Sequence, residues 1–171
     1  MGNGKLDDMI NRKLSVLINQ PLVEIGRASG LTWLCFGKKI MIKDRNGLES
    51  LKSKYALNIQ CPWRFIKNRA IIAASRDIFI PKSDFKDNKF DWEKFGSNHF
   101  DDNIKKINNI ISKSITLVTK ISSDDMGGLN IDFQDDLKME LFPDCSLEKE
   151  FWRFINFENN CDHLIVFDSE D

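Results

Sequence analysis

Residues 55–66 read Tyr-Ala-Leu-Asn-Ile-Gln-Cys-Pro-Trp-Arg-Phe-Ile and form a long strand candidate on which the fold prediction depends. Alternate residues share one face of an extended chain. The residues of that face are Leu57, Ile59, Cys61 and Trp63. We therefore expect Trp63 to be largely buried. Pro62 has no amide donor, which predicts an edge position or a bulge within the run.

The tetrapeptide Trp63-Arg64-Phe65-Ile66 recurs as Trp152-Arg153-Phe154-Ile155. Each copy places a tryptophan beside an arginine among apolar residues that are typical of a core. The second copy falls in a segment where Ser146 can cap a short helix through about Phe154. Because the copies are short and fall on different predicted elements, we interpret the recurrence as chance and not as an internal repeat.

The N-terminal part predicts one helix followed by strands. Apolar residues recur at helical spacing over 5–18, and strand-like composition follows over 22–28 and 31–36. Gly37-Lys38-Lys39 predicts a turn into a further short strand, 40–42. Asn46-Gly47 is a strong hairpin signal.

The middle of the chain predicts return strands over 70–74 and 76–80, followed by a polar segment, 82–98. A flexible linker carries few aromatic residues. This segment has four, so we expect an ordered aromatic-containing loop folded over the core. The four are Phe85, Phe90, Trp92 and Phe95.

The C-terminal part predicts a helix over 101–113 and strands over 115–121, 129–133, 137–141 and 163–167. Gln134-Asp135-Asp136 joins two of these strands as a hairpin. At 171 residues the chain suits a single domain, residues 1–171. The expected fold is α+β, with a mixed or mainly antiparallel sheet packed by two to three helices.

The charges are unevenly distributed along the chain. Residues 1–70 hold 13 basic and 5 acidic residues, a net of +8, and residues 71–171 hold 12 and 21, a net of −9. Interleaving of the halves in the fold would largely cancel these fields. If the halves do not interleave, the acidic residues at turns predict an acidic face that binds a basic partner. The predicted face comprises Asp124, Asp125, Asp132, Asp135 and Asp136.

Signals for chemistry are weak in this sequence. Cys145, Cys161 and His163 lack the paired spacing of zinc ligands, so no metal site is predicted. No catalytic residue and no cofactor are predicted either, because the sequence has no phosphate-binding glycine loop and only two histidines to act as a base. The chain is therefore interpreted as a binding protein rather than an enzyme.

Three arginines lie in or beside apolar runs, where a buried guanidinium needs partners. They are Arg27, Arg64 and Arg76. Pairing with Asp77, Glu140 or Asp144, or stacking on Trp33 or Trp63, is the structural interpretation. The functional interpretation is a recess near Arg27, Trp63 and Arg64 that binds a small molecule or peptide.

Other partner classes are less well supported. The basic residues that would serve nucleic acid flank turns and are not interleaved with stacking aromatics, so nucleic acid is not favoured. They are Lys38, Lys39, Lys43, Arg45, Lys52 and Lys54. No apolar run approaches the roughly 20 residues of a membrane helix. The absence of a signal-peptide pattern and the apolar setting of Cys35 and Cys61 predict a cytoplasmic protein. The sequence is compatible with a homo-oligomer as well as with a monomer.

Several short motifs resemble an uncharacterised bacterial family of small proteins. Its signature strand is similar to Leu57-Asn58-Ile59-Gln60-Cys61-Pro62-Trp63-Arg64, and its N-terminal hairpin to Gly26-Arg27-Ala28 with Leu31–Gly37. Glu140–Asp144 and Trp152-Arg153-Phe154 resemble its C-terminal part. The resemblance implies an association with toxin–antitoxin or toxin–immunity systems. It brings no catalytic residues.

Two function classes follow from the sequence. The first is an immunity or antitoxin-like protein that neutralises a toxin by occupying its surface. The alternative is a small-molecule or peptide binder, with or without enzymatic activity, which uses the recess near Arg27, Trp63 and Arg64.

Overall fold

The computed structural model describes residues 6–43, 46–83, 89–146, 149–158 and 162–166. Two α-helices, two 3-10 helices and ten strands lie within these ranges. The helical elements are α1 (Leu6–Leu14), η1 (Ser15–Leu17), η2 (Ser75–Phe79) and α2 (His99–Lys113). The strands are β1 (Pro21–Ala28), β2 (Leu31–Lys43), β3 (Glu49–Ile59), β4 (Trp63–Lys67), β5 (Ala70–Ala74), β6 (Thr116–Ser123), β7 (Leu129–Phe133), β8 (Leu137–Leu141), β9 (Trp152–Asn156) and β10 (Asp162–Val166).

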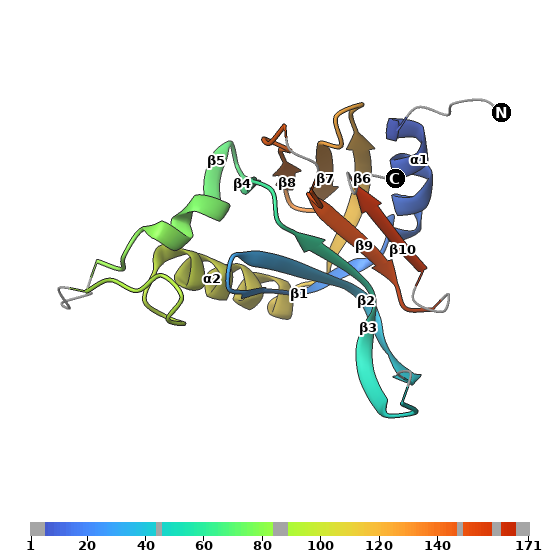
Figure 1. Ribbon diagram of the computed structural model, residues 1–171, viewed down its shortest axis with the longest axis horizontal. Helices are drawn as coiled ribbons and strands as arrows, with labels where there is room; N and C mark the ends of the chain where they lie inside the picture. The colour runs from blue at the N-terminus through green and yellow to red at the C-terminus, as the bar shows by residue number, and fades with distance from the viewer. Residues whose placement is uncertain (1–5, 44–45, 84–88, 147–148, 159–161, 167–171) are drawn as a thin grey trace.

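All described strand pairs are antiparallel, in the order β10-β9-β3-β2-β1-β6-β7-β8-β4-β5. The sheet is narrowest where β1 meets β6, because only Pro21 and Leu22 pair there, with Leu117 and Thr116. Beyond this join the two halves face each other: Figure 1 shows β9 and β10 in front of β6 and β7, and the Trp152 indole of β9 donates to the Gly127 carbonyl, just before β7. Helix α2 runs beside β1, and α1 packs against β6.

The α+β prediction is wrong, because the fold is mainly β with two short helices. The segment predicted as a third helix contains β9, which pairs with β3 and β10. Strand β9 has the burial pattern of a central strand, and Trp152, Phe154 and Ile155 are buried. Aromatic and β-branched side chains favour such a position, so tertiary packing overrides the capping signal of Ser146.

Three further boundaries differ from the sequence predictions. The expected turn at residues 37–39 is a bulge within a continuous β2, where Gly37 has φ +76°. The run 55–66 divides at Pro62 into β3 and β4, which lie in different parts of the sheet. The predicted strand over 76–80 is instead η2, in which the Asp77 side chain accepts a hydrogen bond from the Ala74 amide.

The two Trp-Arg copies occupy equivalent positions at the start of β4 and β9. Trp63 and Trp152 are buried, whereas Arg64 and Arg153 each reach a glutamate. In both copies the Trp and the Phe are buried and the Arg between them is partly exposed, which follows from the period-2 pattern of a strand. The expected burial of Trp63 is confirmed, although it does not share a strand with Leu57 and Ile59.

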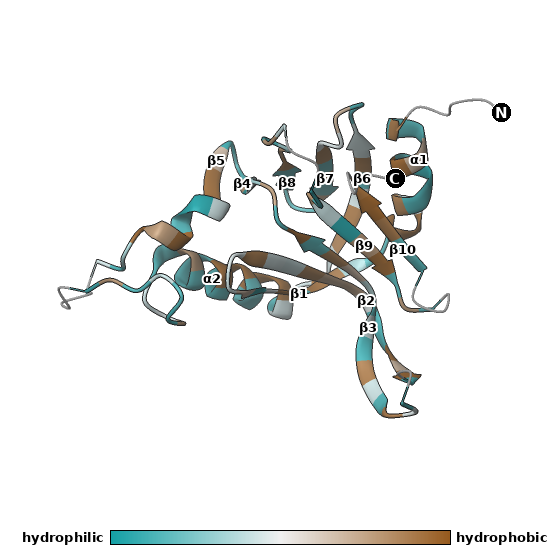
Figure 2. Ribbon diagram, viewed as in Figure 1, coloured by the Kyte–Doolittle hydropathy of each residue, from teal (hydrophilic) through white to brown (hydrophobic). Residues whose placement is uncertain are grey.

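One hydrophobic cluster joins both halves of the sheet and both helices. Helix α1 contributes Ile10 and Leu14, and α2 contributes Phe100, Ile104 and Ile107. Figure 2 shows hydrophobic and hydrophilic residues alternating along each helix, as expected for an amphipathic helix. In the segment predicted as an aromatic loop, Trp92 packs against this cluster, whereas Phe95 is largely exposed and residues 84–88, including Phe85, lie outside the described residues.

The β2–β3 hairpin extends beyond its neighbours as a two-stranded ribbon. Strand β1 pairs with β2 only as far as Phe36, and β9 pairs with β3 only from Tyr55 to Ile59. Residues 39–43 of β2 and 49–53 of β3 pair only with each other among the described residues. We call these ten residues the arm. Figure 1 shows it projecting from the body, past the bulge that bends β2.

Candidate functional site

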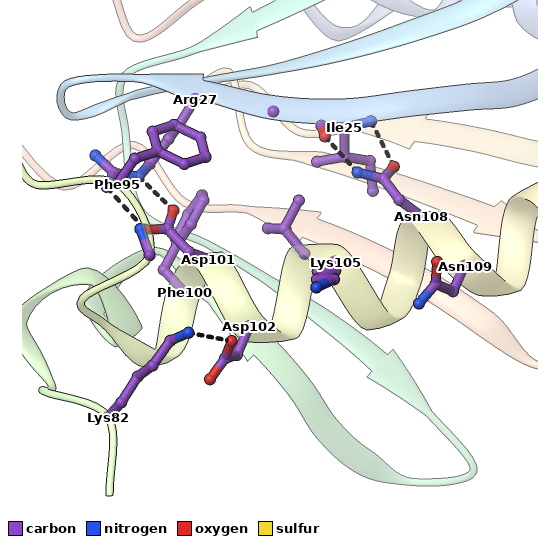
Figure 3. Close-up of a pocket in the computed structure, with 13 residues that line it drawn as sticks. Ile25, Arg27, Lys82, Phe95, Phe100, Asp101, Asp102, Lys105, Asn108 and Asn109 are labelled. Atoms are coloured by element: carbon purple, nitrogen blue, oxygen red, sulfur yellow. Dashed lines mark hydrogen bonds and ion pairs between the residues drawn. The ribbon is translucent and has the colours of Figure 1, made fainter. Parts of the chain in front are cut away.

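A pocket of about 360 Å³ lies between helix α2 and the edge of β1 opposite to its partner strand β2. Its walls come from Ile25 and Arg27 on β1, Phe95 in the preceding loop, and Phe100 and Asn108 on α2. Figure 3 shows β1 above the helix, with the loop closing one end. Helix α2 is held in place by its buried apolar face and by Asn98, whose side chain accepts from the Asp101 amide as N-cap.

The closed end of the pocket contains a buried ion pair. The Nε of Arg27 donates to Asp101 at 2.6 Å and its Nη2 donates to the other carboxylate oxygen at 2.9 Å. The two side chains are 2% and 6% exposed. The Gly96 amide also donates to Asp101, and the Arg27 guanidinium lies 4.7 Å from the centre of the Phe95 ring. Arg27 is therefore fixed by partners on two sides.

Burial by itself would raise the pKa of Asp101. The hydrogen bonds from Arg27 and Gly96, together with the positive charges of Arg27 and Lys82, outweigh it and hold this pKa below its usual value. The carboxylate therefore stays ionised at neutral pH and accepts from the guanidinium rather than acting as a proton donor. This arrangement serves structure better than acid–base chemistry.

Asn108 also lines the pocket, and its side chain forms hydrogen bonds with the free edge of β1. Its side-chain oxygen accepts from the Ile25 amide at 3.0 Å, and its side-chain nitrogen donates to the Ile25 carbonyl at 2.8 Å. Figure 3 shows both bonds. The side chain thus takes the place of a neighbouring strand and satisfies both backbone groups.

We predict that Asn108→Ala lowers the free energy of unfolding by about 1–3 kcal/mol, because it leaves both Ile25 backbone groups unsatisfied. Urea unfolding measures this loss. Asn109→Ala is the matched control. Asn109 is the next residue of the helix and is exposed, so this substitution should change the free energy of unfolding by less than about 0.5 kcal/mol. Equal effects of the two substitutions would contradict the role of Asn108.

The open side of the pocket is polar. Lys82 bonds Asp102 at 2.6 Å, and the exposed Lys105 and Asn109 lie further along α2. Figure 3 shows these two side chains directed away from β1. The charged groups deepest in the pocket, Arg27 and Asp101, already pair with each other. A ligand could therefore form only weak polar contacts, at the mouth of the pocket.

The three residues of the predicted recess do not meet in one pocket. Arg27 lines the pocket beside α2, whereas Trp63 lines a separate pocket of about 380 Å³ and donates its indole N–H to Thr32 at 3.1 Å. Arg64 lies on the outer face of β4 and pairs with Glu140 at 2.6 Å, which is one of the predicted structural partners.

The pocket at Trp63 is lined by aromatic side chains and one exposed cation. Phe79 and Trp92 contact each other edge to face at 5.6 Å between ring centres, and Arg76 lies in the same wall. Cys61 also lines it, and burial raises the pKa of this thiol to about 12. The thiol is therefore protonated at neutral pH and a poor nucleophile.

The predicted acidic face is divided between the two ends of β7. Asp124 and Asp125 lie in the turn before this strand, and Asp135 and Asp136 lie in the turn after it. Four steps along a strand, at about 3.3 Å each, place the two turns roughly 13 Å apart. Asp132, on β7 itself, pairs in register with Lys120 and Lys138, so its charge has neighbours of opposite sign.

The acids at the turns differ in what they do locally. The Asp124 carboxylate accepts from the amides of Met126 and Gly128, so it shapes its own loop. Asp135 and Asp136 have φ of +57° and +58°, a conformation that short polar side chains tolerate. All four acids at these turns are exposed, and Asp125, Asp135 and Asp136 are the ones that we assign to partner contact, because Asp124 shapes its own loop.

Sequence reasoning missed the arm. Its Met41 and Leu51 lie directly opposite each other and are 61% and 57% exposed. A third pocket, of about 410 Å³, lies at its base and includes Trp33, Lys39 and Leu51. The hairpin signal at Asn46-Gly47 is confirmed, but it does not reveal that the neighbouring strands are too short to cover this hairpin.

Comparisons of the chain with protein-family models, curated proteins and solved structures gave no significant match. Within the described ranges, no group of three or more His, Cys, Asp or Glu side chains is placed to hold a metal ion. Of the three residues considered as zinc ligands in the sequence, Cys145, Cys161 and His163, Cys161 lies outside those ranges. No helix among the described residues is both long and apolar enough to cross a membrane.

Proposed function

We propose that this chain is a non-catalytic protein-binding module that acts by covering the surface of a partner, in the manner of an immunity protein or antitoxin. The observation that carries the proposal is the arm, which projects from the body and exposes Met41 and Leu51. A free two-stranded ribbon is only marginally stable by itself. Exposed apolar side chains on such a ribbon add little to the core, and they are typical of a surface that binds a protein partner.

The exposed acids form a second contact in this proposal. Asp125, Asp135 and Asp136 would attract a basic partner, such as a basic toxin, and so accelerate association. Asp124 and Asp132 have the local roles described above and contribute less. The short motifs that resemble a family associated with toxin–antitoxin and immunity systems agree with this function, and the family assignment stays a prediction.

We also propose a cytoplasmic location. Three of the four cysteines are described, and all three have free thiols. Free thiols persist in a reducing compartment, where disulfides are rare.

The experiment begins with capture of partners from the source cell on the purified chain. We expect a basic protein whose association slows as salt rises, because exposed charges are screened beyond about 10 Å at 0.1 M ionic strength. Neutralising Asp125, Asp135 and Asp136 to Asn should lower the on-rate by about tenfold. Asn tolerates the backbone conformation at the last two positions. Co-expression should relieve any toxicity of the captured protein.

The control variant makes the same change in net charge elsewhere. It replaces three exposed acids, Asp8, Glu93 and Asp144, with their amides. Its on-rate should equal that of the wild type within about twofold, since local potentials rather than total charge steer association. If the on-rate changes neither with salt nor in the variant with Asn at positions 125, 135 and 136, the acidic contact is ruled out. A captured protein that binds equally well when Met41 and Leu51 are replaced by Ser would overturn the proposal itself.

A second candidate function, binding of a small molecule or peptide, is favoured by the pocket at Trp63. Its aromatic wall and the exposed Arg76 suit a ligand with a ring and an anionic group. Mass spectrometry of the native, purified chain tests it. A retained small molecule that is lost on Arg76→Ala would favour this function over partner occlusion.

A further inference from the structure

The outer edge of β2 in the arm, residues 39–43, is free to accept another strand. Strand β1 stops pairing at Phe36, and beyond this residue β2 pairs only with β3 among the described residues. Residues Lys39-Ile40-Met41-Ile42-Lys43 form this edge. A free edge displays a row of backbone donors and acceptors that template the addition of a strand.

The opposite edge of the arm is partly covered. The Phe157 amide donates to the Lys54 carbonyl, which continues the line of β9 toward the arm. The Lys52 amino group lies 5.1 Å from the centre of the Phe157 ring, and Lys54 pairs with Glu158 at 2.7 Å. The β2 edge is therefore the more accessible of the two.

The side chains on the β2 edge indicate which strand would fit. Lys39, Met41 and Lys43 are all exposed, and alternate residues of a strand share one face. In an added antiparallel strand, directly opposite side chains lie about 4.5–5.5 Å apart, and pairs of opposite charge are stabilising. Lys43 already reaches Glu49 at 3.1 Å, but both side chains are more than half exposed, so a partner acid can share this lysine.

We propose that the β2 edge of the arm binds an extended segment of a protein partner as an added antiparallel strand, and that this segment carries acidic residues opposite Lys39 and Lys43 and an apolar residue opposite Met41. This inference rests on the proposed function and specifies the partner. The preferred pattern is acidic-x-apolar-x-acidic, a form of β-strand addition in which the backbone supplies affinity and alternate side chains supply specificity.

A second copy of the chain fits this edge poorly. Antiparallel pairing centred on Met41 would place Lys39 of one copy opposite Lys43 of the other. Parallel in-register pairing would place each lysine opposite itself. Like charges directly opposite one another are destabilising, and lysines at strand edges commonly prevent self-association. The same two lysines that attract an acidic strand therefore repel a copy of this edge.

The test is an NMR titration of the full chain with the blocked peptide Ser-Glu-Thr-Ile-Thr-Glu-Ser. We expect shifts of the amides of residues 39–43. The analogue with both Glu replaced by Lys should bind about tenfold more weakly. In the variant Lys39→Glu/Lys43→Glu this preference should reverse, so that the lysine peptide binds better. Because both lysines are exposed, the variant should fold, and circular dichroism checks this.

A second probe separates strand addition from simple charge attraction. N-methylation of alternate peptide residues removes the amide donors that face β2 in one register and should abolish binding. Binding unaffected by N-methylation, or a charge preference that does not reverse, overturns the inference. Tighter binding of a DNA duplex, lost in the same variant, would instead make the arm a nucleic-acid element. A wild-type dimer that dissociates on Lys39→Glu/Lys43→Glu would assign the edge to self-association.

Failure of this inference can be told apart from failure of the proposed function. If a captured partner needs Met41 and Leu51 but the peptide does not bind, only the strand-addition model fails. If the peptide binds with the expected reversal but no captured protein depends on the arm, the proposed partner occlusion fails and the edge remains a peptide site.

Discussion

Replacing Trp63 with alanine is expected to lower the free energy of unfolding by about 3–5 kcal/mol. Trp63 is 3% exposed and connects three parts of the fold. Its ring packs edge to face on Phe65 in the sheet and on Phe100 in α2, at 5.7 and 5.5 Å between ring centres, and its indole donates to Thr32 in β2. The substitution removes all of these contacts and leaves a large cavity.

Urea unfolding followed by far-UV circular dichroism measures this loss without relying on tryptophan fluorescence. Trp63→Phe should cost less, since it keeps part of the ring packing and loses the hydrogen bond to Thr32. Phe79→Ala is the exposed aromatic control and should change stability by less than about 1 kcal/mol, because Phe79 is 59% exposed. An unchanged unfolding midpoint for Trp63→Ala, together with lost partner binding, would make Trp63 a surface hot spot instead.

The elements that sequence reasoning predicted well have short-range signals. The β7–β8 hairpin has apolar residues on alternate positions and a turn whose Asp135 and Asp136 adopt positive φ. Helix α2 has acids in its first turn and one apolar stripe. Such patterns depend on a few neighbouring residues, so they can be read without knowledge of the rest of the fold.

The elements that were mispredicted depend on distant partners. Ser146 resembles a helix cap and so predicts a helix through the start of β9, whereas the conformation of β9 is set by pairing with β3, about a hundred residues earlier in the chain. The arm was missed for the same reason, since its exposure follows from the lengths of β1 and β9. Asp101, the partner of Arg27, was not among the predicted partners because it comes from α2, which the fold places beside β1.

Replacing Arg27 with leucine is expected to cost about 3–5 kcal/mol at neutral pH, because it leaves the Asp101 carboxylate buried without its main partner. Arg64→Leu is the matched control. Arg64 also pairs with a carboxylate, on Glu140, but its side chain is 41% exposed. Pairs of that kind contribute up to about 1 kcal/mol. Similar losses for the two variants would contradict the structural role assigned to Arg27.

The pH dependence of this loss tests the same ion pair. In the wild type the folded pKa of Asp101 is lowered, so its stabilising contribution is present above the unfolded pKa of about 4 and is lost as the pH falls through the folded pKa. Without Arg27, burial raises the pKa of Asp101, and protonation in acid relieves the unpaired charge. The stability difference between wild type and Arg27→Leu should therefore shrink from pH 7 to pH 3. Urea unfolding at the two pH values measures it, and a constant difference would show that Arg27 stabilises the fold through packing instead of charge.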